Sequence, residues 1–299
     1  MSLLSAPLPT ACATTGSAAG AKKPVILVVS FGTSFKESRD AAIGGIERAI
    51  AAAYPAYEVR RAFTSQIIIN HIKKDGDGEI DNVEAAFKRL IKDGVKELII
   101  QPTHIMNGEE YDELITQAKP FESKFTSVKY GKPLLSSDTD YDELITVLTG
   151  VTASYNDGGT AIIFMGHGAG HETNATYARL VGLFKSKGIP NYYIGTIEAE
   201  PALDEIIADI AKTDVKKVVL EPLMIVAGDH ANNDMAGDEE DSWKSILSAR
   251  GYSVTPVLKG LGQFPEVQAM FVRHAGEAPV TRGSSIASFG AFAVFLLRF

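Results

Sequence analysis

Residues 97–108 read ELIIQPTHIMNG, and residues 217–228 read KVVLEPLMIVAG. In both stretches an apolar run leads into a proline, and an isoleucine and a glycine follow in register. A continuous apolar run of this length is typical of a strand buried on both faces of a parallel sheet. The chain is therefore predicted to contain two similar halves, each built around such a strand.

Strands and helices alternate around these two stretches. Further strands are predicted from apolar runs at 25–29, 58–63, 161–165 and 192–196. Helices are predicted from apolar residues at helical spacing at 37–53 and 83–91. This alternation implies βαβ units with right-handed crossovers. We predict an α/β fold with two similar doubly wound parallel-sheet domains, residues 24–150 and 151–274, facing across a cleft.

Composition excludes several classes of protein. The chain has 299 residues, of which 45% are hydrophobic and 22% charged, as in an ordinary globular protein. Its formal net charge is −8 without any block of Lys and Arg, which argues against a nucleic-acid partner. The single cysteine, Cys12, excludes an internal disulfide and a Cys-ligated zinc site. No stretch approaches the ~20 apolar residues that span a bilayer.

Nucleotide-binding motifs are absent from the sequence. No G-x-x-x-x-G-K-[ST] segment is present, so a P-loop that hydrolyses ATP is not expected. The glycine segments FGTSF and MGHGAG do not match G-x-G-x-x-G, so an NAD site is not expected. The segment DGDGEID at 75–81 resembles a calcium loop, but Ile80 stands where that loop requires glycine, and a polar turn is expected instead.

Both ends of the chain differ from the middle. Residues 1–23 are rich in Ala, Ser, Thr and Gly and carry no charge before Lys22. They form either a leader that acts as an export signal or a disordered extension. The protein is periplasmic under the first interpretation and cytoplasmic under the second. Residues 275–299 form an atypical tail, in which the apolar run 286–297 is too short to span a membrane.

Three side chains of metal-binding type lie beyond the ends of predicted strands in the second half: His167, Glu198 and His230. Ligands of open parallel sheets bind beyond the carboxyl ends of the strands, so we expect these side chains to converge on one rim. Two imidazoles and a carboxylate suit a divalent first-row metal. The structural alternative is that the histidines cap helices or bond carbonyls and that Glu198 belongs to an acidic first helical turn.

His104 occupies a similar place after a strand of the first half. It either faces the same cleft or serves a structural role, and the sequence leaves both interpretations open.

Seven segments between about Val25 and His274 carry a family resemblance: VVSFGTSF, RAFTS, HIMNGEEY, KPLLSSDTDY, FMGHGA, VAGDHANNDMAGDEEDSWK and GLGQFPEVQAMFVRH. They resemble the sirohydrochlorin cobaltochelatases of the anaerobic cobalamin pathway (CbiK type), and the VAGDHANNDMA string is the most specific. The resemblance implies the fold of the ATP-independent chelatases, which is similar to that of the single-chain ferrochelatases. That fold has two doubly wound α/β domains facing across a cleft.

The resemblance also implies a reaction and a site. Members of the family insert Co²⁺ into sirohydrochlorin, and some accept Fe²⁺ or Ni²⁺. His167 in FMGHG, Glu198 in GTIE and His230 in VAGDH match the family's metal-binding residues. They are therefore expected to be metal ligands and catalytic residues, with Co²⁺ as the substrate metal and without ATP or NAD.

Sirohydrochlorin carries many carboxylates, whereas this chain is net negative. The cleft is therefore expected to supply local donors to the tetrapyrrole. The candidates are the segment after the first strand, with its backbone N–H groups, and nearby basic side chains: Ser30, Phe31, Gly32, Thr33, Arg60, Arg61 and His104.

Two alternatives stay open beside cobalt insertion. One is a related chelatase that prefers Fe²⁺ or Ni²⁺, and the other is a carrier that binds metal or tetrapyrrole without turnover. Haem binding and the oligomeric state, including a homo-oligomer, are not decided by the sequence.

Overall fold

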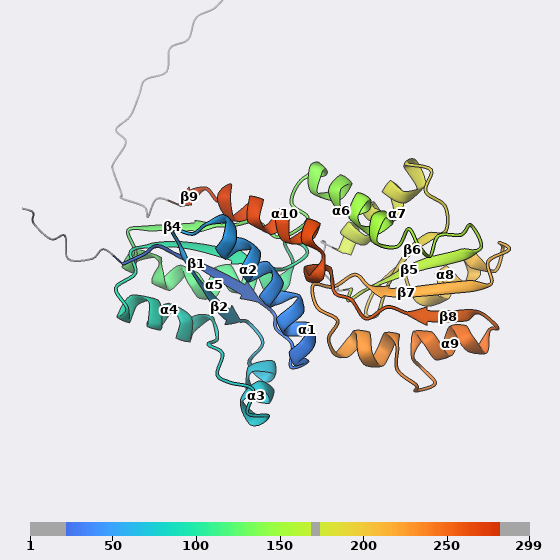
Figure 1. Cartoon of the computed structure of the whole chain (residues 1–299), viewed down its shortest axis with the longest axis horizontal. Helices are drawn as coiled ribbons and strands as arrows, with labels where there is room; N and C mark the ends of the chain where they lie inside the picture. Colours follow the sequence, from blue (N-terminus) through green and yellow to red (C-terminus); the bar gives the residue numbers. More distant parts are fainter. Residues whose placement is uncertain (1–21, 169–173, 282–299) are drawn as a thin grey trace, which may run out of the picture.

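The computed structural model of the chain describes residues 22–168 and 174–281, which fold around two sheets (Figure 1). The first sheet has the order β2 (Glu58–Phe63), β1 (Val25–Ser30), β3 (Glu97–Pro102), β4 (Ser127–Tyr130) and β9 (Val280–Thr281). The second has the order β6 (Tyr192–Thr196), β5 (Thr160–Gly166), β7 (Lys217–Pro222) and β8 (Ser253–Pro256). All neighbours pair in parallel except β4 and β9. The prediction of an α/β fold with two parallel sheets is confirmed.

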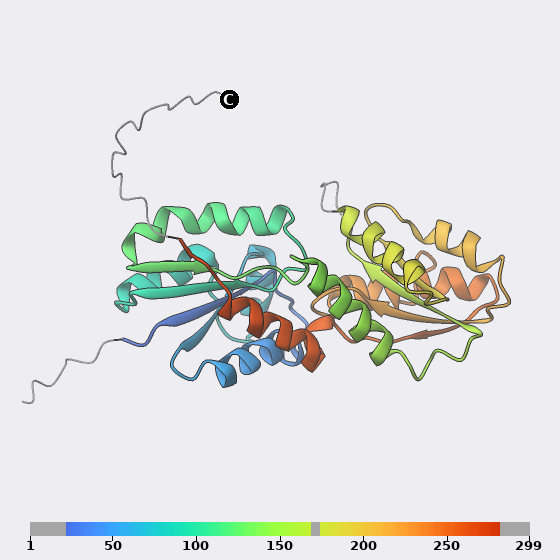
Figure 2. The same ribbon diagram turned by 90° about the horizontal axis from the view of Figure 1, so that it is seen from above.

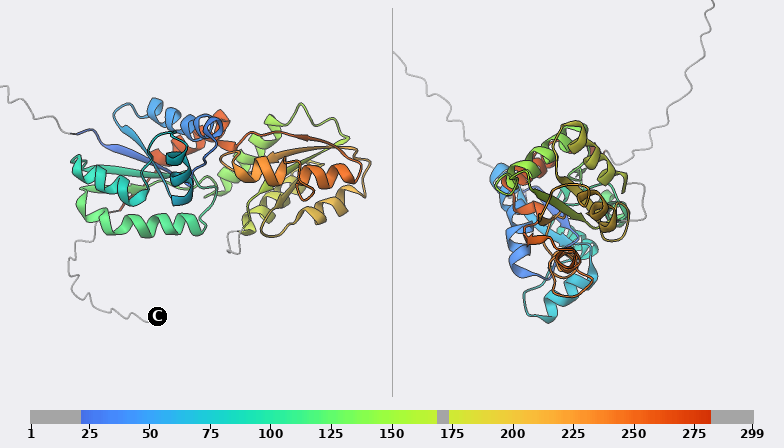
Figure 3. Two further views of the ribbon diagram at one scale, coloured as in Figure 1. Left: turned by 90° about the horizontal axis from the view of Figure 1, so that it is seen from below. Right: turned by 90° about the vertical axis from the view of Figure 1, so that its right-hand side faces the viewer.

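Helices cover both faces of each sheet (Figure 3). Those before β5 are α1 (Lys36–Ala41), α2 (Ile43–Ala53), α3 (Gln66–Lys74), α4 (Val83–Lys92), α5 (Glu109–Ala118), the 3₁₀ helix η1 (Lys119–Lys124) and α6 (Asp138–Val151). Those after β5 are α7 (Ala175–Ser186), α8 (Leu203–Ile210), the π-helical turn η3 (Ala231–Met235), α9 (Trp243–Ala249), the 3₁₀ helix η4 (Leu261–Gln263) and α10 (Pro265–Gly276).

The central strands form where the sequence is continuously apolar. All six residues of β1 and all seven of β5 are buried, because each strand has neighbours on both sides and helices on both faces. β4 (SVKY), which lies between β3 and β9, and the edge strand β8 (SVTP) are short and only partly buried, and the apolar pattern of the sequence does not mark them. The helix expected at 37–53 is two helices, α1 and α2, divided at Ala42, whose backbone stays in the right-handed helical region with φ at −87° and ψ at −68°.

The chain returns to the first sheet at its C-terminal end. α10 packs against α2, and β9 pairs antiparallel with β4 through Val128 and Thr281 (Figure 2). A segment after the second sheet thus completes the core around the first. The division of the chain near residue 150 remains a proposal, and any such division has to place α10 with the first sheet.

The expectations for the two ends fall largely outside the described residues. The leader assigned to 1–23 is described only at its last two residues, and the tail assigned to 275–299 only as far as residue 281. Within 22–168 and 174–281, no helix is long and apolar enough to cross a membrane.

Candidate functional site

A cavity of about 470 Å³ lies where the carboxyl ends of the two sheets meet. Its walls are formed by the segments that follow β1 and β3 of the first sheet and β5 and β7 of the second. Most of the site residues expected from the sequence line it: Ser30, Phe31, Gly32, Thr33, His104, His167 and His230. The expected cleft between the two halves is therefore present, and the histidines of both halves face it.

Glycine turns bring the chain into this cavity in both halves. Gly32 has a φ of +106°, and a Cβ there would lie 2.5 Å from the ring of Phe63. Gly168 has a φ of +83°, and a Cβ there would lie 2.9 Å from the backbone N of Ala199. Both positions therefore require glycine, since other residues are strained at positive φ and no space exists for a side chain.

The two turns are equivalent positions of the internal repeat. In the first sheet Val29 pairs with Pro102, and in the second Met165 pairs with Pro222. Val29 and Met165 are therefore equivalent positions. Phe31 lies two residues after Val29 and His167 two residues after Met165, so these two residues are also equivalent. The same turn therefore presents an apolar ring on one side of the cavity and an imidazole on the other.

His167 and His230 lie next to each other. Their ring centroids are 4.8 Å apart and the rings meet edge to face at 74°. Nδ1 of His167 lies 2.8 Å from the carbonyl oxygen of Gly168, and Nδ1 of His230 lies 2.6 Å from Oδ2 of Asp234. A carbonyl or carboxylate oxygen only accepts, so each Nδ1 carries the proton and donates it. Each Nε2 then keeps its lone pair, which is the arrangement of a metal-ligating histidine.

Glu198 stands beside His167, although it is not among the described residues that line the cavity. Its backbone N–H donates to the carbonyl of His167 at 3.0 Å, which fixes the turn after β6 against the turn after β5. Its Oε1 lies 3.8 Å from Nε2 of His167. The side chains of His167 and Glu198 are 44% and 55% exposed, so an ion can reach them from solvent.

The three side chains are neighbours without being a finished three-ligand site. In the part of the chain that the structure describes, no group of three or more His, Cys, Asp and Glu side chains is placed so that it could hold a metal ion. The assignment of His167, Glu198 and His230 as joint ligands therefore remains a prediction. It requires Glu198 and the imidazoles to adjust their rotamers when the ion arrives.

His104 lines this cavity and an adjoining one of about 140 Å³. Both of its ring nitrogens are buried and have no hydrogen-bond partner. Burial lowers the pKa of His104 to about 4, and the carboxylate of Glu110 only partly opposes this. His104 is therefore a neutral imidazole at physiological pH, with one donor and one acceptor available to a ligand.

Several residues of the site are missing from the expectations, among them Glu110, Tyr177 and Asp234. Glu110 lines both cavities and, counted from the paired prolines, takes the place in the first half that His230 takes in the second. Extending the sequence repeat by two residues would have found it. Tyr177 accepts a hydrogen bond from the backbone N–H of Gly168 at 3.4 Å, and Asp234 bonds His230; no repeat marks either residue.

The two arginines expected to bind substrate carboxylates do not line the cavity. Nε and Nη2 of Arg61 each lie 2.6 Å from a carboxylate oxygen of Glu47 on α2. Arg60 bonds Glu58 and Asp93. Both guanidinium groups are therefore occupied by acids of their own half.

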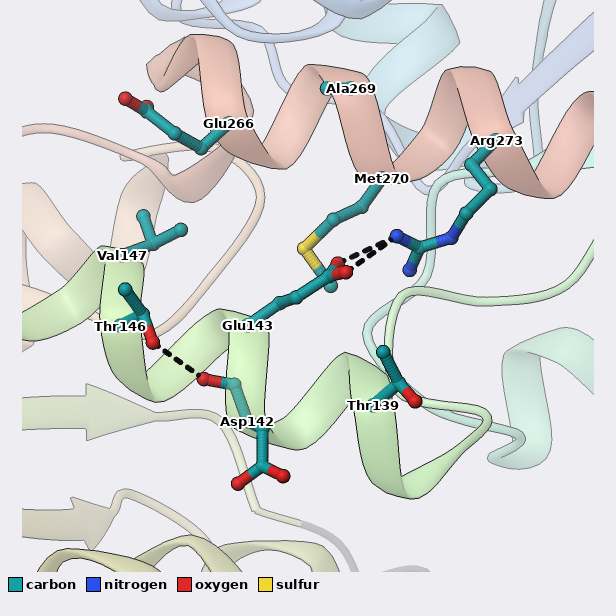
Figure 4. Close-up of a pocket in the computed structure, with 9 residues that line it drawn as sticks. All are labelled: Thr139, Asp142, Glu143, Thr146, Val147, Glu266, Ala269, Met270 and Arg273. Carbon is teal, nitrogen blue, oxygen red and sulfur yellow. Dashed lines mark hydrogen bonds and ion pairs between the residues drawn. The ribbon is translucent and has the colours of Figure 1, made fainter.

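A second hollow, of about 550 Å³, lies between α6 and α10, away from the strand ends (Figure 4). Figure 4 shows Arg273 reaching across it to Glu143, and none of the expected site residues lines it. It is a groove between packed helices that an ion pair bridges.

Comparison with known proteins agrees with the fold and identifies the family. The family described as cobalt chelatase (CbiK) matches residues 24–279. The sirohydrochlorin cobaltochelatase of Salmonella typhimurium is 40% identical over 256 residues, which cover 86% of this chain and 96% of that protein. Sirohydrochlorin cobaltochelatase CbiKC of Nitratidesulfovibrio vulgaris is 29% identical over 254 residues, covering 84% and 89%.

Solved structures share the architecture at low sequence identity. SirB from Bacillus subtilis superposes with a TM-score of 0.59 at 15% identity, covering 86% of this chain and 95% of SirB. CbiX, described as the terminal enzyme of siroheme biosynthesis in denitrifying bacteria, gives 0.50 at 17% identity, covering 85% and 98%. These similarities support the fold alone, whereas the family match extends over most of the sequence. The chain belongs to the cobalt chelatase (CbiK) family.

Proposed function

We propose that this protein inserts Co²⁺ into sirohydrochlorin, without ATP, as a step of cobalamin biosynthesis. The observation that carries the proposal is the pair of imidazoles, His167 and His230, whose Nε2 atoms are left free by the hydrogen bonds of Nδ1 in a cavity between two sheets. The family match and the names of the curated relatives supply the metal and the tetrapyrrole.

The imidazole pair suits the delivery of a metal rather than its permanent storage. Neutral imidazole is a good ligand for Co²⁺, and two such ligands leave most coordination positions of the ion open. Glu198, 3.8 Å from His167, adds a carboxylate that can take a third position. Few and exposed ligands allow the ion to leave for the four nitrogens of the macrocycle.

Insertion exchanges two pyrrolic protons for one dication, so two protons must leave the ring. Glu198 stands within reach of the imidazole that would hold the ion, and as a carboxylate it can accept the two protons one after the other. Since its side chain is 55% exposed, it can pass each proton to water before it takes up the next. The reaction transfers no electrons, so no oxidant or reductant is required.

An absorbance assay of metallation tests the proposal. At limiting Co²⁺, His167→Ala and His230→Ala are each expected to lower the rate at least about tenfold, because each removes a ligand. Glu198→Gln keeps the shape of the side chain and removes its charge, and it is expected to lower the rate as well. Asp209→Asn serves as its control. Asp209 is an exposed carboxylate on α8 that pairs with Lys212.

The same assay separates the alternatives. A carrier would bind Co²⁺ and sirohydrochlorin without accelerating their combination over the uncatalysed rate. A chelatase for another metal would show higher kcat/KM with Fe²⁺ or Ni²⁺ in direct competition with Co²⁺. Full activity of both histidine variants at limiting metal would exclude the proposed site.

A further inference from the structure

The cavity between the sheets contains no positive side chain. In the described part of the chain its walls include neither lysine nor arginine, and the carboxylates of Glu110 and Asp229 are its only side chains with a full charge when the histidines are neutral. The two arginines expected from the sequence, Arg60 and Arg61, are paired elsewhere. Arg39 lies behind the wall, where it donates to the carbonyl oxygens of Thr33 and Ser34 and pairs with Asp77. The substrate of the proposed function, by contrast, is a polyanion.

The rim of the same cavity is apolar and exposed. Five large apolar side chains are exposed in the described part of the chain, and three of them, Phe31, Phe35 and Ile67, line this cavity. Phe31 is 50% exposed and Ile67 is 69% exposed. Exposed apolar groups scattered singly are ordinary, but their gathering at one cavity indicates a surface that a ligand covers.

The three exposed apolar side chains and the two imidazoles of the proposed metal site come from different halves of the chain. Phe31 and Phe35 follow β1, and Ile67 begins α3, so all three belong to the first half. His167 and His230 follow β5 and β7 of the second half. A flat conjugated ring in this cavity would turn one face to the apolar wall and the other to the imidazoles.

We propose, on the basis of the function proposed above, that the tetrapyrrole is held by its faces and not by its carboxylates. Phe31, Phe35 and Ile67 contact the ring face opposite the incoming metal. The acidic side chains of the ring point out of the cavity mouth into water. The shape and the flat apolar faces of the macrocycle, rather than ion pairs with its carboxylates, then determine which tetrapyrroles bind.

The proposal makes salt dependence diagnostic. Ion pairs with carboxylates weaken when salt screens them, so a site that binds through such pairs loses affinity at high ionic strength. Here the remaining electrostatic effect is repulsion between a polyanion and a chain of net charge −8 whose cavity carries two further carboxylates. Screening should therefore leave the affinity unchanged or improve it.

The first experiment is a fluorescence titration of metal-free sirohydrochlorin into the full-length protein at 20 and 500 mM KCl. The expected result is a Kd at high salt that is equal to the low-salt value or about twofold lower. A Kd that rises more than about threefold at high salt would overturn the proposal, since it would reveal cationic contacts.

Variants of the rim give a second, independent readout in the same titration. Phe31→Ala and Ile67→Ala are each expected to raise the Kd about tenfold, because apolar contact area is lost. Tyr155→Ala and Leu258→Ala are matched controls, since these exposed apolar side chains do not line the cavity, and they should bind as the parent protein does. Unchanged binding by both rim variants would overturn the proposal.

The metallation rate of the parent protein keeps the two proposals apart. If the protein metallates sirohydrochlorin but its affinity falls with salt, only the mode of binding is wrong. If it does not metallate sirohydrochlorin at all, the proposed function itself is wrong.

Discussion

The imidazole of His104 lies in surroundings that strongly disfavour its protonated form. Its ring nitrogens are buried and without partners, and burial lowers its pKa to about 4. An unfolded chain takes up a proton at His104 near pH 6.5, whereas the folded protein does not until the pH approaches 4. His104 therefore costs no stability above pH 6.5 and destabilises the fold progressively as the pH falls from there towards 4.

This linkage predicts the behaviour of His104→Gln, which cannot be protonated. Between pH 7 and pH 5, the free energy of unfolding of the parent protein should fall by about 2 kcal/mol more than that of the variant. Urea denaturation at the two pH values measures the difference. Equal slopes for parent and His104→Gln would contradict the assigned burial.

Asp234 is expected to act through His230 rather than on the substrate. Its Oδ2, 2.6 Å from Nδ1, holds the tautomer in which Nε2 can bind a metal. Asp234→Ala should therefore raise the KM for Co²⁺ about tenfold, with a smaller change in the KM for sirohydrochlorin. Asp234→Asn retains an acceptor oxygen. Its KM for Co²⁺ should lie between that of Asp234→Ala and that of the parent protein.

The control for Asp234 is another carboxylate of the same loop. Asp238 is exposed and paired with Lys244, so Asp238→Ala should leave the KM for Co²⁺ unchanged. An equal rise for both substitutions would show that loss of negative charge, rather than the bond to His230, weakens metal binding.

At the scale of single elements, β3 and β7 are matched strands that hold different buried polar side chains at one equivalent position. Gln101 of β3 and Glu221 of β7 directly precede the equivalent prolines. Glu221 is 2% exposed, and burial raises its pKa to about 7 although Lys259 partly offsets this. Because the unfolded chain loses this proton at a lower pH than the folded protein, Glu221 weakens the fold increasingly as the pH rises from about 4.5 to 7.

Glu221→Gln should therefore stabilise the protein at alkaline pH. The substitution places in β7 the residue type that β3 already holds, and it removes a carboxylate that is costly to ionise. At pH 8 the free energy of unfolding should rise by about 2–3 kcal/mol, with a much smaller gain at pH 5. Thermal or urea unfolding at both pH values checks this; a loss of stability at pH 8 would mean that the ionised carboxylate is stabilised by its surroundings.

The sequence predicts elements well where a single local property determines them. Both faces of the central strands β1 and β5 are covered, so each strand consists mainly of apolar residues. This apolar run is visible in the sequence. The short strands β4 and β8 carry no such run, since most of their residues are only partly buried or exposed. The division at Ala42 between α1 and α2 is not predicted by the apolar spacing, which continues through both helices.

For the site, the repeat and the strand ends were informative, whereas partners distant in sequence were not. His104, His167 and His230 reach one cavity because strand ends of two sheets face each other. Arg61 does not reach it, because Glu47 on a neighbouring helix binds its guanidinium group. No pattern in the sequence reveals that pair, since the two residues are brought together only by the packing of α2 on β2.

At the scale of the whole molecule, the two halves share a continuous apolar core. One cluster of buried residues includes Ile46 of α2, Met270 of α10, Leu144 of α6 and Phe164 of β5. The helices α6 and α10 pack against each other in this cluster, and the carboxylate of Asp140 lies where they meet. Asp140 of α6, whose side chain is 2% exposed, bonds His274 at 2.9 Å and Arg273 at 2.6 Å.

Asp140 stays ionised in this setting. Burial opposes its charge, but hydrogen bonds from Ser137 and His274 outweigh that effect and lower its pKa. A buried carboxylate with this many donors fixes the approach of α6 to α10, and through them the approach of one sheet to the other. Removing it would leave the buried His274 and the partly buried Arg273 without their shared acceptor.

Asp140→Ala is therefore expected to lower the free energy of unfolding by about 3 kcal/mol at pH 7, because breaking a buried pair leaves uncompensated polar groups. Asp142→Ala, two residues along the same helix, removes an exposed carboxylate that pairs with Lys187 and should cost less than about 1 kcal/mol. Urea unfolding of both variants measures the contrast. If the two losses are equal, the polar group at the contact does not hold the halves together, and the apolar cluster alone fixes the distance across which His167 and His230 face Phe31.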